Sequence, residues 1–321
     1  MASKTFLIPP WLAQKIPALR KAGWYLEAGV VRLLARLMAA MPPERAAGFA
    51  NSVFRNLRPV LPFAAKIRRN LGLAFPEKDR RELDRLTRSA CGNFGNAAAE
   101  LVLAKRIWDE REQRIEFVVA EGVNLADYRG RPAIMVTGHI GAWQISTFLA
   151  TQYELPVTSV YAPEENPYLR ALVLRLRSTL GCRFISRDGC MRGLTQELKR
   201  GNMVGLVSDT RLDSGDTIPF FGVPTPSNTT AARLALRHNC DFFPVRAERL
   251  PGMRFRITLF PAIRPADADA SVAEQAQQMT SRLFEYFEVW IRENPDQWMC
   301  FGRRWPHEAY AAVPPGKNDR G

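Results

Sequence analysis

The second part of the chain constrains the fold most, because short apolar runs alternate there with segments of helical periodicity from about residue 130. The runs predict strands and the intervening segments predict helices. The expected strands are Ala133–Thr137, Val157–Tyr161, Arg183–Ser186, Met203–Ser208, Phe242–Ala247 and Phe255–Phe260. The expected helices are Ala142–Thr151, Pro167–Leu180, Met191–Lys199, Thr229–Arg237 and Val272–Arg292. This alternation predicts an α/β fold with a mixed, mostly parallel central sheet flanked by helices.

The first 76 residues differ, since they are basic and of helical pattern. They hold twelve lysines or arginines but only two acids, Glu27 and Glu44. Between residues 22 and 41 an apolar stripe recurs at helical spacing, opposite Arg32 and Arg36. The stripe comprises Leu26, Val30, Leu33, Leu34, Leu37 and Met41. Such an amphipathic helix can lie in a bilayer interface or pack on its own domain, and periodicity alone does not separate these alternatives.

Composition narrows the classes of function. Hydrophobic residues make up 46% of the 321, which suffices for a large buried core. The five cysteines form no Cys-x-x-Cys pair and the three histidines no His-Glu-x-x-His motif, so we expect no metal site. The net charge of +13 favours anionic lipid or an acidic protein as partner. Nucleic acid is not expected, because no nucleic-acid-binding motif accompanies the charge.

One histidine stands where chemistry is expected. The predicted strand Ala133–Thr137 leads directly into Gly138 and His139, and ligands of open α/β sheets bind at the carboxyl ends of strands. A neutral imidazole is the usual general base for a hydroxyl nucleophile. Gln144 follows five positions later and could hydrogen-bond the ring. The alternative is a histidine with a purely structural role.

Five blocks in order along the chain carry a family resemblance. They are Arg68–Pro76, Gly138–Gln144, Leu198–Gly201 with Ser208–Arg211, Pro219–Pro224, and Asn294–Trp298 with Arg303–Trp305. Together they resemble the lipid A biosynthesis (lauroyl/myristoyl) acyltransferase family over about residues 25–306. The resemblance implies a glycerolipid-acyltransferase-like fold and an enzyme that moves a fatty acyl chain from a thioester to a hydroxyl of a lipid or glycolipid.

The resemblance also implies roles for residues. His139 would be the general base, and residue 144 would orient and polarise its ring. Backbone N–H groups beside His139 would meet the developing negative charge. The substrate-binding residues would be Arg177, Asp209, Arg211, Phe220, Phe221, Gly222, Arg303 and Arg304. Arginines suit phosphate groups of the acceptor, although each could equally be a solvated surface charge, and the two phenylalanines could equally be plain core.

The expected organisation follows from these parts. Residues 1–76 would form a membrane-associating helical region, residues 77–306 an α/β acyltransferase domain and residues 307–321 a loose tail. The partners would be acyl carrier protein, or coenzyme A, as donor, a membrane lipid as acceptor and an anionic membrane surface. No cofactor is expected. The implied location is the cytoplasmic face of the inner membrane, with peripheral or monotopic attachment.

The chain departs from the family pattern at three positions. Gln144 stands where the family has Asp or Glu, Gly302 where a histidine is usual, and Cys300 where an aromatic residue is common. Gln144 brings no charge to balance an imidazolium. Two alternatives therefore remain beside the active lipid A-type enzyme. One is a family member with a different acceptor, such as a phosphatidylinositol mannoside, a lysolipid or a secondary metabolite, and the other is a catalytically silent lipid-binding scaffold.

Overall fold

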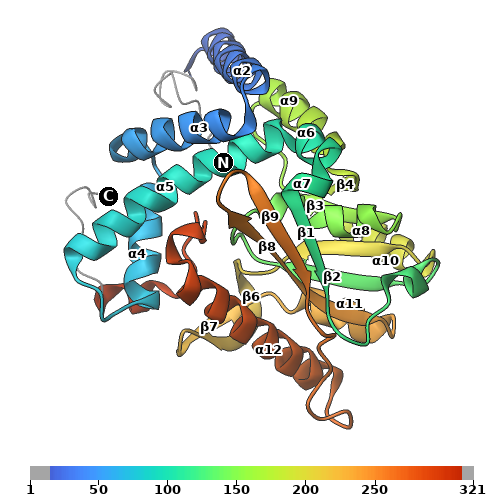
Figure 1. Cartoon of the computed structure of the whole chain (residues 1–321). Coiled ribbons are helices and arrows are strands. Elements are labelled where there is room, and N and C mark those ends of the chain that lie inside the picture. The colour runs from blue at the N-terminus through green and yellow to red at the C-terminus, as the bar shows by residue number, and fades with distance from the viewer. Residues whose placement is uncertain (1–14, 313–321) are drawn as a thin grey trace.

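The computed structural model describes residues 15–312. Its centre is a seven-stranded sheet in the order β1-β9-β8-β2-β5-β3-β4 (Figure 1). These strands are β1 (Ile115–Val119), β2 (Ala133–Thr137), β3 (Val157–Tyr161), β4 (Arg183–Ser186), β5 (Met203–Val207), β8 (Asp241–Leu250) and β9 (Arg254–Leu259). All neighbouring pairs are parallel except β8 with β9. The prediction of an α/β fold with a mostly parallel sheet is confirmed.

All six expected strands are present, with ends shifted by at most three residues, but three further strands were missed. The first is β1, an edge strand whose residues beyond Ile115 are only partly buried, so it carries no long apolar run. The other two form a separate antiparallel hairpin of β6 (Arg211–Phe220) and β7 (Val223–Ser227). The polar stretch within β6 and the prolines in β7 concealed both, because neither strand alternates apolar with polar residues.

Helices cover both faces of the sheet. This is required because successive side chains of β2 point to opposite faces and all of them are buried. Ile134 and Val136 belong to a core shared with α4, α10, α11 and α12, whereas Ala133 and Met135 belong to a core shared with α3, α6 and α8. The helices are α2 (Pro17–Ala40), α3 (Pro43–Leu57), α4 (Ala64–Ala74), α5 (Arg80–Val102), α6 (Ala104–Asp109), α7 (Arg111–Arg114), α8 (Phe148–Gln152), α9 (Pro167–Arg177), α10 (Cys190–Lys199), α11 (Thr230–Arg237) and α12 (Val272–Glu293). Because β2 is buried on both faces, its sequence is a continuous apolar run.

The expected helix over Ala142–Thr151 was only partly right. A 3₁₀ segment, η3 (Trp143–Thr147), precedes the short helix α8. The backbone N–H of Ala142 donates to the carbonyl oxygen of Ala247 at 2.8 Å, so this turn is bonded across to β8. A backbone hydrogen bond between distant segments cannot be predicted from the spacing of hydrophobic residues along the sequence.

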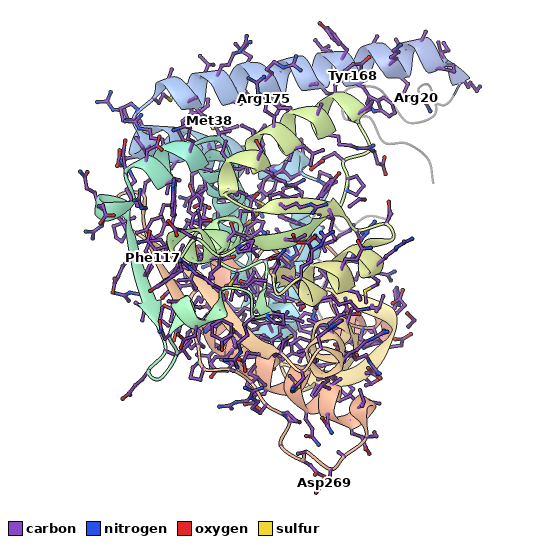
Figure 2. All side chains as sticks on the ribbon, turned by 90° about the vertical axis from the view of Figure 1, so that its right-hand side faces the viewer. Arg20, Met38, Phe117, Tyr168, Arg175 and Asp269 are labelled. Atoms are coloured by element: carbon purple, nitrogen blue, oxygen red, sulfur yellow. The ribbon has the colours of Figure 1, made fainter. Side chains whose placement is uncertain are left out.

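Four of the six residues of the predicted apolar stripe face outward, whereas Leu34 is partly buried and Met41, just after the end of α2, packs against the core. Leu26, Val30, Leu33 and Leu37 are 58%, 47%, 58% and 45% exposed, while Met38 on the other face is buried. Figure 2 shows α2 lying along the outer side of α9. Their contact includes the Asn166 side chain, which donates to the Trp24 carbonyl oxygen at 2.9 Å. Within residues 15–312, no helix combines the length and the hydropathy that crossing a bilayer requires.

The helical N-terminal region shares a core with the sheet. Met38, Ala46 and Ala50 belong to the same buried cluster as the sheet residues Met135 and Phe243. At the crossing of α3 and α5, a side chain on Gly95 would come within 2.2 Å of the Ala50 carbonyl oxygen. Only glycine allows this approach. The division at residue 76 therefore stays a prediction about function, since packing is continuous across it.

Candidate active site

The carboxyl ends of β2 and β5 bring His139 and Asp209 together. Each residue lies two positions beyond the end of its strand, and the strands are adjacent and parallel. The Nδ1 atom of His139 lies 2.7 Å from Oδ1 of Asp209. The second carboxylate oxygen of Asp209 accepts a hydrogen bond from the indole Nε1–H of Trp298 at 3.1 Å. Topology thus places an acid beside the histidine from 70 residues further along the chain.

The loop that carries His139 is clamped on two sides. The carbonyl oxygen of His139 accepts from the N–H of Met299 at 2.8 Å, and the N–H of Gly141 donates to Gln297 at 3.1 Å. Gly141 has a φ of +62°, and a Cβ there would lie 2.3 Å from the Ala247 carbonyl oxygen. Only glycine fits this position. Because the N–H groups of Gly141 and Ala142 are both bonded within the protein, neither is free to serve as the expected oxyanion donor.

Burial and charge shift the pKa values of His139 and Asp209 in opposite directions. Asp209 is 1% exposed and the His139 side chain 29%. Burial by itself would raise the pKa of Asp209, but the His139 charge and the hydrogen bonds from His139 and Trp298 lower it below its ordinary value. Burial would likewise lower the pKa of His139, yet the adjacent Asp209 charge and hydrogen bond raise it above its ordinary value. The pair therefore favours an anionic carboxylate beside a more basic imidazole.

Gln144 makes a different contact from the one expected of it. It lies in η3, and its side-chain Nε2–H donates to the carbonyl oxygen of Ala97 in α5 at 3.1 Å. The ring nitrogen that an orienting residue would hold, Nδ1 of His139, is instead next to Asp209. Gln144 and His139 both line the same pocket.

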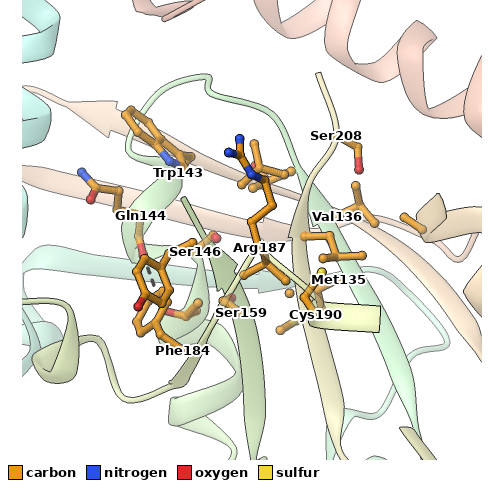
Figure 3. A pocket seen from close by; sticks show the side chains of 18 of the residues that line it. Met135, Val136, Trp143, Gln144, Ser146, Ser159, Phe184, Arg187, Cys190 and Ser208 are labelled. Carbon is orange, nitrogen blue, oxygen red and sulfur yellow. Dashed lines mark hydrogen bonds between the residues drawn. The ribbon is translucent and has the colours of Figure 1, made fainter. Parts of the chain in front are cut away.

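This pocket opens beside His139 and has a volume of about 430 Å³. Figure 3 shows it bordered by Trp143 and Gln144 on one side and by Val136 and Ser208 on the other. Its apolar lining is Met135, Val136, Val160, Leu180, Phe184, Met191, Leu194, Leu206 and Val245. Arg177 and Arg187 add positive charge to the lining. An apolar cavity with polar groups near a potential base suits a molecule with a hydrocarbon part and a reactive polar end.

Arg177 is the one expected substrate-binding arginine that lines the pocket. It forms an ion pair with Glu164 at 3.1 Å and lies 5.4 Å over the Tyr161 ring. Arg211 does not line it and donates to the Trp305 carbonyl oxygen at 2.8 Å. Arg187, which sequence reasoning missed, lines the pocket and is 70% exposed. Its only sequence signal was its place just after β4, at the same edge of the sheet as His139.

The remaining expected binding residues lie away from this pocket. Phe220 is fully buried and packs against Trp298 and Trp305, and Arg304 is equally buried 4.4 Å over the Phe220 ring. Burial lowers the pKa of Arg304 to about 10. Phe221 and Gly222 form the turn between β6 and β7, with φ values of +50° and +74°. Arg303 is exposed. Phe220 and Phe221 pack against Trp298, and Arg304 packs against Phe220.

The C-terminal block is held by the upstream Arg-Asn-Leu block. Asn70 is buried and donates to the carbonyl oxygens of Cys300 at 2.9 Å and Gly302 at 2.8 Å, while Tyr310 donates to Asn70 at 2.5 Å. Only backbone atoms of positions 300 and 302 take part in the bonds to Asn70. A side chain at Gly302 would meet nothing within 4 Å. The two departures from the family pattern in this block therefore leave its anchoring intact.

Fold and site together define an α/β protein with a histidine–aspartate pair beside an apolar pocket at the carboxyl edge of its sheet. Within residues 15–312, no group of three or more His, Cys, Asp or Glu residues is arranged to hold a metal ion. A family model described as bacterial lipid A biosynthesis acyltransferase matches residues 13–307. The chain belongs to this family.

One curated protein and one solved structure are similar to this chain. A lipid A biosynthesis acyltransferase of Haemophilus influenzae is 21% identical over 193 residues, which cover 59% of this chain and 58% of that protein. The aligned part thus spans little more than half of that relative. The solved structure of the 1-acyl-sn-glycerophosphate (LPA) acyltransferase PlsC from Thermotoga maritima aligns with a TM-score of 0.37 and 14% identity, covering 84% of this chain and 97% of that one.

Proposed function

We propose that this chain is a membrane-associated O-acyltransferase, which moves a fatty acyl group from a thioester to a hydroxyl of a lipid or glycolipid. The observation that carries the proposal is the position of His139, which lies beside Asp209 and lines the apolar pocket. The apolar lining suits an acyl chain, and the partly exposed imidazole is within reach of a polar reacting group. Membership of the acyltransferase family supports the same reaction class.

In the proposed reaction, Nε2 of His139 accepts the proton of the acceptor hydroxyl as its oxygen attacks the thioester carbonyl carbon. The new C–O bond forms, the C–S bond breaks, and the imidazolium returns the proton to the departing thiolate. The raised pKa of His139 supports the first step, because a more basic imidazole is a stronger proton acceptor while it is neutral.

The acceptor would be presented at a membrane. The exposed stripe of α2 offers Leu26, Val30, Leu33 and Leu37 to a bilayer, and the neighbouring exposed cations Lys21 and Arg36 suit anionic headgroups. Attachment is then peripheral, in the interface, and we place it on the cytoplasmic face of the inner membrane, as for the family. Arg177 and Arg187 at the pocket suit a phosphate on either substrate.

The donor would be carried by an acidic protein such as acyl carrier protein. Met191, Arg192 and Lys199 are exposed on one face of α10, and Met191 also lines the pocket. Arg183, Arg187 and Arg200 lie nearby and are more than half exposed. Two acidic residues lie beside these cations, Asp188 and the largely buried Glu197. A positive surface beside a pocket would attract and orient an acidic carrier. Coenzyme A is the alternative donor.

The test is acyl transfer by the purified chain, with labelled acyl carrier protein or acyl-coenzyme A and an extracted membrane-lipid mixture. The expected result is a labelled lipid whose mass identifies the acceptor and which is absent with His139→Ala. No product with either donor, despite an intact fold and membrane binding, would overturn the enzyme in favour of the silent lipid-binding scaffold. A product of unexpected mass would instead identify a member with a non-lipid-A acceptor.

A further inference from the structure

The pocket beside His139 reaches both faces of the sheet. β2 is buried along its whole length, whereas the last three residues of β3 and of β5 are partly exposed, although both strands lie inside the sheet. These residues, 159–161 and 205–207, all line the pocket. Successive side chains of a strand point to opposite faces, so exposure of three in a row requires open space on both faces. The pocket therefore extends around the strand ends and consists of two compartments.

One compartment, which we call the α10 compartment, lies on the face that α10 and α11 cover. Its lining is Val136, Val160, Met191, Leu194, Leu206 and Ala231. Val160 and Leu206 pack against the core that contains Leu194. Ser208 and Thr230 also line the pocket, where β5 ends and where α11 begins. Apolar walls with polar groups near the strand ends suit a hydrocarbon chain whose reactive end lies toward His139.

The other, which we call the α9 compartment, lies on the opposite face and is bordered by η3 and α9. Its lining is Ser146, Thr147, Ser159, Tyr161, Arg177 and Phe184. Ser159 pairs with Gly205, which pairs in turn with Met135 of the core on this face. The guanidinium of Arg177 lies 5.4 Å over the Tyr161 ring. Hydroxyl groups and a guanidinium suit a polar head group that carries hydroxyls or phosphate.

We propose that the two substrates occupy opposite faces of the sheet, with the acyl chain of the donor in the α10 compartment and the polar head of the acceptor in the α9 compartment. The proposal rests on the proposed function, since it places the substrates of that reaction. Figure 3 shows Ser146 and Phe184 on one side of the pocket and Val136 and Cys190 on the other. Both substrates are then bound at once, and the acyl group passes directly from the donor sulfur to the acceptor oxygen beside His139.

The outer surface beside each compartment agrees with this assignment. Met191 lines the α10 compartment and is 45% exposed on α10, the helix whose Arg192 and Lys199 suit an acidic carrier. On the other face, α2 lies along the outer side of α9 (Figure 2). The exposed apolar stripe of α2 thus lies next to the α9 compartment. A carrier-bound donor would arrive from the α10 side, and a membrane-bound acceptor from the α9 side.

The first test locates the acyl chain and needs no turnover. The probe is a ketone analogue of acyl-pantetheine, in which a methylene replaces the sulfur and the chain ends in a photoreactive diazirine. The acyl group of this analogue cannot be transferred, because attack would have to break a C–C bond. After irradiation, peptide mass spectrometry should find the label on α10 or α11. A label mainly on η3, α8 or α9, or equal labelling of the two groups, would overturn the proposal.

The second test uses two neighbouring residues of β3. Ser159 and Val160 are both partly exposed but face opposite compartments. Val160→Phe should weaken binding of the longest of a series of saturated analogues about tenfold or more, because it fills space that the chain would occupy, and should leave the shortest unaffected. Ser159→Phe should leave the whole series unaffected and raise KM for the lipid acceptor. Isothermal titration calorimetry measures the affinities.

The reverse pattern, in which Ser159→Phe weakens binding of the long analogues and Val160→Phe does not, would contradict the assignment. If either variant fails to fold, the labelling of the unsubstituted protein decides. Labelling on α10 or α11 without acyl transfer to any lipid would leave the place of the chain standing and reject the proposed function alone.

Discussion

At the scale of single residues, one hydrogen-bonded pair dominates the site. His139 was expected from its place after a strand, and the structure locates it there. The partner at Nδ1 is a residue to which the sequence had given a different task, the binding of the acceptor. An acid therefore lies next to Nδ1 of His139, although position 144 carries none.

The raised pKa of His139 determines in which direction kcat/KM changes with pH. The imidazole must be neutral to accept a proton, so kcat/KM should fall about tenfold for each pH unit below the His139 pKa. Because the Asp209 charge raises that pKa, the fall should begin at a higher pH than for an ordinary histidine. The measurement is kcat/KM for acyl transfer between pH 5 and pH 9. An acid limb centred below the ordinary histidine value would contradict it.

Gly141 should be intolerant of any side chain. In Gly141→Ala, the alanine would have to adopt a left-handed backbone conformation, and its Cβ would lie 2.3 Å from the Ala247 carbonyl oxygen. We therefore expect a loss of about 3 kcal/mol or more in the free energy of unfolding. Gly122 is the matched control, because it has a similar φ of +77° with nothing within 4 Å. Gly122→Ala should cost about 1 kcal/mol. Equal losses in urea unfolding would show that the clash is relieved at no cost.

At the scale of elements, α2 and α10 present the surfaces on which the proposed partners depend. The periodicity of α2 had left its apolar stripe open to two interpretations. The structure packs the helix through its other face, where Ala28, Ala35 and Met38 are buried. The outward stripe therefore still lacks a partner within the described part of the chain.

Membrane binding should be sensitive to charge on that stripe. Val30→Glu places a carboxylate at the centre of the apolar surface, so we expect at least a tenfold weaker association with vesicles of anionic phospholipid. Val289→Glu on α12 is the control, since Val30 and Val289 are similarly exposed, at 47% and 52%. Vesicle flotation measures both. Unchanged flotation of Val30→Glu would reject α2 as the contact surface.

The basic face of α10 should matter for one kind of donor only. Arg192→Glu with Lys199→Glu should lower kcat/KM about tenfold or more for acyl carrier protein, because attraction becomes repulsion. Transfer from acyl-pantetheine, which has no carrier protein, should be unchanged. Arg80→Glu with Arg81→Glu provides the control, since these exposed residues begin α5 on the far side of the molecule (Figure 1). Equal losses with both donors would reject carrier docking on α10.

At the scale of the whole molecule, the C-terminal segment connects α4 to the candidate active site. It is held by Asn70 on α4, and it holds both Asp209 and the His139 loop. The stability of the site is therefore coupled to a helix near the start of the chain.

Loss of the Asn70 side chain should loosen this segment. Asn70→Ala removes two donated hydrogen bonds and leaves buried carbonyl groups unpaired, so we expect a loss of about 2–4 kcal/mol in unfolding free energy. Limited proteolysis should also cut near residues 300–306 sooner than in the unsubstituted chain. Asn56→Ala is the control, because Asn56 is exposed and both of its side-chain hydrogen bonds, to the Ser52 carbonyl oxygen and from Arg88, lie at the surface. Unaltered stability in Asn70→Ala would contradict this coupling.

The sequence by itself determined six of the seven strands of the central sheet, since apolar runs such as Ala133–Thr137 are recognisable where a strand is buried on both faces. It also determined that His139 follows such a run. A few consecutive residues were enough to predict these features, because burial of a strand on both faces requires each of its residues to be apolar. The strands without a clear period, β1, β6 and β7, were missed for the same reason.

Only the tertiary structure decided what His139 meets. Its contacts with Asp209 and the segment at Trp298 join residues 70 and more positions apart, and strand order sets them. Spacing along one segment pointed to Gln144, but η3 turns that side chain toward α5. The direction of the α2 stripe was likewise set by which face found a partner. Periodicity encodes that a face exists, whereas packing decides what covers it.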